Sequence, residues 1–194
     1  METENIVFKK DELIKMEENI SEFLSKRDFS SCDTKDPVKF AKKLGFSVFL
    51  ADFDEIDGII IVNEYEKKIG KFENNKIIAV NSSASKPCKR FIIAHELAHY
   101  IQASSKETGK IVYAQRDHCP FPGTGIRDRE EQKTDYMAAA LLMPKEEFKK
   151  DWEILQNDYP GMNELEKIER LKEKYVVDEK AVKRRISEIL MMGE

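Results

Sequence analysis

Histidine and cysteine are scarce in this chain, with three of each among 194 residues. Cys32, Cys88 and Cys119 are odd in number and widely spaced, and no C-x-x-C pair occurs. We therefore expect three reduced thiols in a cytoplasmic protein. The chain also lacks an apolar run long enough to cross a bilayer, and its first residues, METENIVFKKDE, do not resemble a signal peptide. No membrane partner is expected.

Positive charge is not in excess either, because Lys and Arg number 33 against 37 Asp and Glu, giving a net charge of −4. Phosphate binding is driven by clustered Lys and Arg, so this balance argues against nucleic acid as the main partner. The length fits one domain with a sizeable core. We divide the chain into an N-terminal helical segment at 1–35, a core at 36–157 and a C-terminal helical tail at 158–194.

Two of the three histidines stand in one motif, His95-Glu96-Leu97-Ala98-His99, which has the pattern H-E-x-x-H. Residues four apart in an α-helix share a face, so both imidazoles could bind one metal ion. Glu96 would project beside them, where it could take a proton from a water that the metal activates. The simpler alternative is an amphipathic helix with two solvated histidines.

The segment around this motif predicts a helix. Ser85 suits the N-cap, and Pro87 suits the first turn because proline lacks the N–H that would be unpaired there. The apolar residues opposite the histidines are Ile93, Leu97, Tyr100 and Ile101. One face would then enter the core while the other bound the metal.

A catalytic zinc ion takes three protein ligands and keeps a fourth position open. The candidates for the third ligand are His118, Cys119, Cys88, Cys32 or a carboxylate. The best one lies in a second predicted helix, 129–144, where Glu131 and Asp135 are four residues apart and share a face. Glu131 could bind the metal, and Asp135 could accept a hydrogen bond from a ligating histidine. The alternative for Glu131 is a solvated carboxylate in a first helical turn.

These motifs resemble those of the ImmA/IrrE family of zinc metallopeptidases. Arg90-Phe91 precedes the H-E-x-x-H motif at the family's spacing, and the run AAALLMP follows Glu131 at 138–144. Thr134, Asp135 and Met137 stand where the family usually has Ala, Asn and Phe. The similarity extends over about Asp36 to Pro144, with a looser match to the tail.

The resemblance implies an α+β fold with a zincin-like core, in which a small, mostly antiparallel sheet packs on the H-E-x-x-H helix. It implies one Zn²⁺ per chain bound by His95, His99 and Glu131, with Glu96 as general base and Asp135 orienting His95. The substrate would be a helix-turn-helix transcriptional repressor, cleaved in a stress-response or mobile-element circuit. The alternative is a non-catalytic regulatory protein with a structural or vestigial metal site, acting by binding protein or DNA.

Apolar runs predict three strands, at 46–53, 58–63 and 76–81. By resemblance, the strand at 76–81 or its neighbour could bind extended substrate by β-augmentation. The stretch 104–129 is the least regular and could supply the hydrogen bond that a developing oxyanion needs. The candidate donors are His118, Tyr113, Arg127 and Tyr136, of which we favour His118.

Helical patterns occur at 11–27, 36–44 and 145–157, with Asp36 as an N-cap of the second. Two further helices follow Tyr159-Pro160-Gly161, and Asp178 is the expected N-cap of the last one. This tail resembles a helix-turn-helix. However, residues 165–190 contain eight basic and six acidic side chains, so we favour packing or protein recognition over DNA binding.

Overall fold

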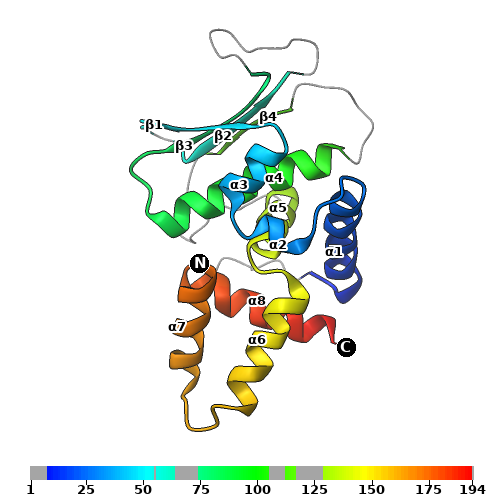
Figure 1. The fold of residues 1–194 in the computed structure, drawn as a ribbon, viewed down its shortest axis with the longest axis vertical. Helices are drawn as coiled ribbons and strands as arrows, with labels where there is room; N and C mark the ends of the chain where they lie inside the picture. Colours follow the sequence, from blue (N-terminus) through cyan, green and yellow to red (C-terminus); the bar gives the residue numbers. More distant parts are fainter. Residues whose placement is uncertain (1–7, 55, 64–73, 105–111, 117–128, 194) are drawn as a thin grey trace.

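The computed structural model describes residues 8–54, 56–63, 74–104, 112–116 and 129–193 (Figure 1). Within these ranges the fold is α+β, as predicted, with eight helices and one four-stranded sheet. The sheet lies at one end of the molecule and the C-terminal helices lie at the other, with helix α4 (Lys86–Ser104) and helix α5 (Arg129–Leu142) between them. No helix in the described ranges combines the length and apolar character needed to span a bilayer.

The sheet has the strand order β1-β3-β2-β4. Its strands are β1 (Ser47–Ala51), β2 (Gly58–Val62), β3 (Lys76–Asn81) and β4 (Val112–Arg116). Only β1 and β3 are parallel, whereas β2 pairs antiparallel with both β3 and β4, so the sheet is mostly antiparallel as predicted. The first three strands match the predicted apolar runs. Strand β4 was missed, because it lies in the stretch that we expected to be irregular.

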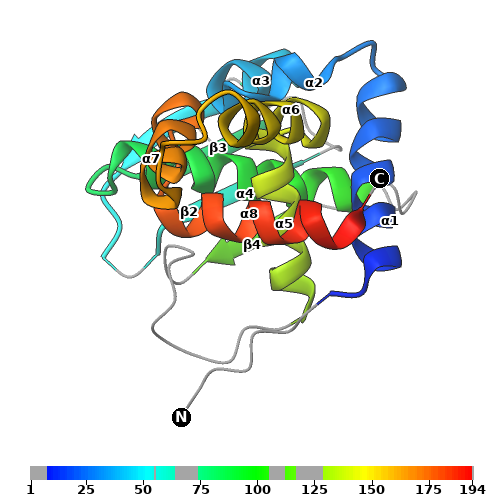
Figure 2. The same cartoon turned by 90° about the horizontal axis from the view of Figure 1, so that it is seen from below.

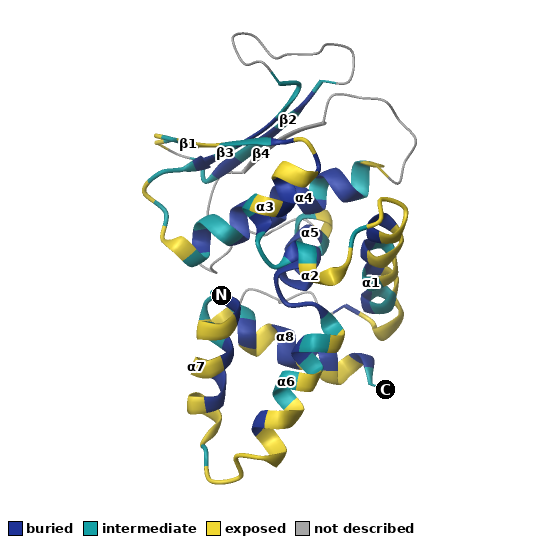
Figure 3. Ribbon diagram, viewed as in Figure 1, coloured by how far each residue is buried: buried dark blue, intermediate teal, exposed yellow. Residues whose placement is uncertain are grey.

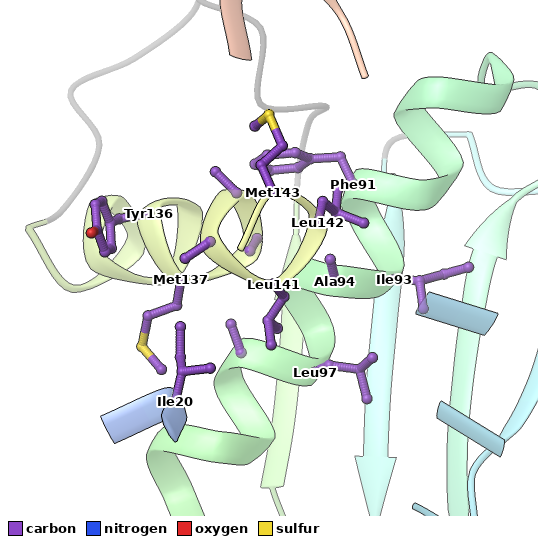
Figure 4. Packing of buried hydrophobic residues seen from close by; sticks show 14 of the residues in the cluster. Ile20, Phe91, Ile93, Ala94, Leu97, Tyr136, Met137, Leu141, Leu142 and Met143 are labelled. Atoms are coloured by element: carbon purple, nitrogen blue, oxygen red, sulfur yellow. The ribbon is translucent and has the colours of Figure 1, made fainter. Parts of the chain in front are cut away.

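Helix α4 packs against the sheet on one side and against α5 on the other, which leaves little of it exposed (Figures 1 and 4). The backbone N–H of Cys88 donates to Ser85 Oγ at 3.4 Å, which confirms the predicted N-cap. The apolar residues of β2 and β3 that meet this layer include Ile60, Ile78 and Val80, which are fully buried. Close packing on both sides fixes the position of the H-E-x-x-H motif.

Three helices precede the sheet, namely α1 (Lys10–Ser25), α2 (Ser31–Thr34) and α3 (Pro37–Lys43). Asp36 accepts a hydrogen bond from the Lys39 N–H at 3.1 Å and caps α3 as predicted. Helix α2 lies between the predicted helices at 11–27 and 36–44, where we predicted no helix. Its single turn is closed by Ser30, whose N–H donates to Asp33 at 2.8 Å in a capping box, a local pattern that polar composition conceals.

Cys88 is disulfide-bonded and lies in the first turn of α4, so the expectation of three reduced thiols is wrong. Cys32 is a free thiol. A disulfide depends on the distance between two cysteines in the folded protein, and their spacing along the sequence does not give that distance.

The tail forms α6 (Lys145–Asn157), α7 (Glu164–Tyr175) and α8 (Glu179–Met192), and Asp178 caps α8 through the Ala181 N–H at 2.9 Å. Helix α8 packs across α1 and α5 (Figure 2). The fully buried guanidinium of Arg185 donates to the carbonyl of Met143 at 3.0 Å and to Glu17 Oε1 at 2.7 Å. A buried charge therefore ties the last helix to the first and to the end of α5.

Val176, between α7 and α8, has φ 52° and ψ 53°, which is the left-handed conformation. A β-branched residue is strained there, because its Cβ approaches the backbone. We predict that Val176→Gly raises the free energy of unfolding by about 1 kcal/mol, measured by urea denaturation. Val177→Gly is the matched control, because Val177 is buried and its replacement should destabilise the protein. A Val176→Gly protein less stable than wild type would contradict the prediction.

Candidate metal centre

His95 and His99 lie one turn apart on the same face of α4, with ring centroids 4.7 Å apart. Glu131 comes from the first turn of α5 and lies against both rings. Its Oε2 is 3.2 Å from His95 Nε2, and its Oε1 is 3.5 Å from His99 Nε2. One ligand atom from each residue lies within 4.8 Å of the other two, so the three could bind one metal ion. The structure thus brings together the three residues that the sequence analysis selected.

Asp135 lies one turn after Glu131 and is buried, with its Oδ1 2.9 Å from His95 Nδ1. A carboxylate accepts this hydrogen bond, so the proton belongs on Nδ1 and the lone pair of the imidazole on Nε2. This is the position expected for a residue that orients His95.

The surroundings of His95 Nε2 test whether a metal fits. This nitrogen is buried and has no hydrogen-bond partner in the described part of the chain, yet it faces a carboxylate oxygen of Glu131. Two lone pairs at 3.2 Å repel each other unless a cation lies between them. Two imidazoles and one carboxylate are also a donor set that zinc accepts. The residues present therefore fit a divalent metal.

The centre is open to solvent on one side. The side chain of His95 is fully buried, but those of His99 and Glu131 are 19% and 43% exposed. Water and a substrate can therefore approach from the side of Glu131 and His99, as a catalytic rather than a structural metal site requires.

Glu96 is fully buried on α4 beside these residues and is not a member of the metal-binding group. Its Oε1 lies close to the backbone of Gly58, at the start of β2: a Cβ added to Gly58 would be 3.3 Å from this oxygen. Sequence reasoning missed Gly58. The only available signal was a glycine at the beginning of an apolar strand, which can mark a close approach of backbone to a neighbour.

Of the remaining candidates, those whose side chains the structure describes do not join the centre. His118, Cys119 and Arg127 lie outside the described residues, and of Tyr113 only the backbone is described. Tyr136 donates its hydroxyl to Glu17 at 2.8 Å, and burial raises the pKa of this phenol, so its proton stays in that bond. Of the two described cysteines, Cys32 is exposed and Cys88 is disulfide-bonded, and neither belongs to the metal-binding group.

A comparison with known protein families shows to which of them the chain is related. The model of peptidase family M78, described as the IrrE N-terminal-like domain, matches residues 41–187. The chain belongs to this family. The match includes α4, α5 and most of the tail, and it supports a peptidase, consistent with a metal-dependent one given the His95, His99 and Glu131 group. No curated protein matches this M78 chain.

The hydrogen bond from His95 to Asp135 gives the first test of the M78 centre. We predict that Asp135→Ala weakens zinc binding by about 10- to 100-fold, because His95 loses the partner that fixes its tautomer and ring orientation. Competition with a chromophoric chelator would measure the affinity. Asp135→Asn is the matched control, since its amide oxygen can still accept the hydrogen bond and should preserve most of the affinity. Equal affinity of Asp135→Ala and wild type would contradict the role of Asp135.

Proposed function

We propose that this chain is a zinc-dependent endopeptidase that hydrolyses a peptide bond in a protein substrate. The observation that supports this most strongly is the convergence of His95, His99 and Glu131 on one point, with Asp135 behind His95. The sheet over α4 is consistent with a zincin-like core. A zinc ion bound there would lower the pKa of a coordinated water and polarise the carbonyl of the scissile bond.

The other steps of the proposed reaction are assigned to residues of the chain. His95, His99 and Glu131 bind the metal, and Asp135 holds the Nδ1 proton of His95 so that Nε2 stays a ligand. Glu96 accepts the proton of the attacking water on its carboxylate and delivers it to the leaving amine. Glu96 is fully buried and directly follows the metal-binding residue His95 on α4. The oxyanion donor is left unassigned, and His118 stays a prediction.

The substrate that we propose is a helix-turn-helix transcriptional repressor, on the basis of the resemblance to ImmA/IrrE peptidases. We expected the strand at 76–81 or its neighbour to pair with substrate. The first option is excluded, because β3 (76–81) is hydrogen-bonded to β1 on one side and to β2 on the other, and the second stays open. Among the described strands, β1 and β4 are the outer ones. Strand β4 pairs with β2 at Gly58, next to Glu96, so we propose that extended substrate adds to β4.

Metal content tests the ligand set. We predict about one zinc per wild-type chain and a loss of most of it in Glu131→Ala, because a catalytic site needs all three protein ligands. Elemental analysis of protein purified without chelator would measure it. Glu130→Ala is the matched control, since Glu130 is exposed, lies on the same helix and ion-pairs with Lys133. A wild-type protein that takes up no zinc, even when zinc is added, would favour the non-catalytic regulatory alternative.

Cleavage tests the general base. We predict that Glu96→Gln retains zinc but lowers turnover by about 10²- to 10⁴-fold, because the amide cannot accept the proton of the attacking water. Purified helix-turn-helix repressors from the same organism would serve as substrates, with fragments identified by mass spectrometry. A Glu96→Gln protein that cleaves at the wild-type rate would exclude this mechanism. Cleavage of other proteins but of no repressor would remove the substrate proposal and leave the peptidase.

A further inference from the structure

The sheet makes a very close approach to α4 at Gly58. A Cβ placed on Gly58 would lie 2.3 Å from Ile92 Cγ2, 3.3 Å from Glu96 Oε1 and 3.5 Å from the carbonyl oxygen of Ala79. The first distance is a steric overlap, and the second is shorter than most contacts of a real Cβ. Because φ of Gly58 is not in the left-handed region, lack of space rather than backbone conformation requires glycine here.

Gly58 lies on the buried face of β2, where the other positions carry large side chains. Gly58, Ile60 and Val62 alternate along the strand and are all buried. The later two positions carry β-branched side chains, which are common in strands. The side chain is missing only at the position next to Glu96. The two contacted side chains, Ile92 and Glu96, are four residues apart and therefore share the face of α4 that meets β2.

We propose that Gly58 is a positioning residue for Glu96, because its lack of a side chain leaves the space that the carboxylate occupies beside the metal-binding group. This inference rests on the proposed peptidase function, in which Glu96 must lie near the metal. A methyl group at residue 58 would crowd Glu96 Oε1 and displace the carboxylate. Glu96 itself touches the reacting atoms, whereas Gly58 acts only through it.

The binding of acetohydroxamate tests this placement without a known substrate. A hydroxamate chelates zinc and offers a proton to a carboxylate next to the metal, so its affinity reports the position of Glu96. We expect Gly58→Ala to retain about one zinc per chain. We expect it to bind acetohydroxamate about tenfold more weakly than wild type, the effect of losing one hydrogen bond to a charged group. Calorimetry on the zinc-loaded proteins would measure both quantities.

A double-mutant cycle separates positioning from general packing. Glu96→Gln removes the carboxylate and should weaken acetohydroxamate to a similar extent. If Gly58 acts through Glu96, Gly58→Ala added to Glu96→Gln causes no further loss. A role confined to packing would instead give two losses that multiply.

The overlap with Ile92 could prevent Gly58→Ala from folding, so a second variant removes it. Gly58→Ala combined with Ile92→Ala eliminates the overlapping methyl group and leaves the crowding of Glu96. Ile92→Ala alone is the control, and we expect it to bind acetohydroxamate as wild type does. The combined variant should remain about tenfold weaker.

Two results would overturn the inference while the proposed function stands. One is wild-type acetohydroxamate affinity in zinc-loaded Gly58→Ala or in Gly58→Ala/Ile92→Ala. The other is a further loss when Gly58→Ala is added to Glu96→Gln. Failure of the wild-type chain to take up zinc would be a different result, because it overturns the proposed function and the inference with it.

Discussion

The hydrogen bond of 2.9 Å between His95 Nδ1 and Asp135 Oδ1 crosses the interface between α4 and α5, and the metal centre depends on that interface. One helix carries both imidazoles and the other carries Glu131, so neither contains the centre alone. Apolar side chains hold the two helices together, and Ala94 of α4 and Leu141 of α5 belong to the same buried cluster (Figure 4). A shift of α5 would move Glu131 and Asp135 together, because they are one turn apart on the same helix. Close packing of the core between α4 and α5 therefore fixes the positions of the side chains that could bind a metal.

Features that depend on neighbours along the chain could be predicted from the sequence. The spacing of His95 and His99, the shared face of Glu131 and Asp135, and the N-caps at 36, 85 and 178 all follow from helical geometry. Features that depend on partners far along the chain could not be predicted. The central place of β3, the existence of β4 and the disulfide at Cys88 are examples, since each is decided by which segments meet in space. Gly58 belongs to this second class, because its role depends on its close contact with side chains of α4.

The C-terminal tail is joined to the rest of the structure by more than apolar packing. Burial colours in Figure 3 show exposed residues along the outer side of α7, while α8 has one covered side and one exposed side. Within that covered side, Arg185 is fully buried and donates to Glu17 of α1 and to the carbonyl of Met143, the residue that follows the helix carrying Glu131. A charge removed from water is stabilised only while its partners stay in place. The tail therefore supports the orientation of α5, and through it the metal centre, whatever else its surface contacts.

The charges of α8 bear on what that surface binds. Lys183 pairs with Glu179 at 2.5 Å, Arg184 pairs with Glu188 at 2.7 Å, and Arg185 pairs with Glu17. Exposed pairs contribute little stability, but they balance the positive charge that phosphates would need. Apolar side chains are exposed on the same tail, with Leu165 at 65%, Leu190 at 66% and Met191 at 43%. Apolar groups with balanced charge around them suit a protein surface better than a DNA backbone. The surface of the tail therefore suits a protein partner better than DNA, in line with the protein substrate that we propose.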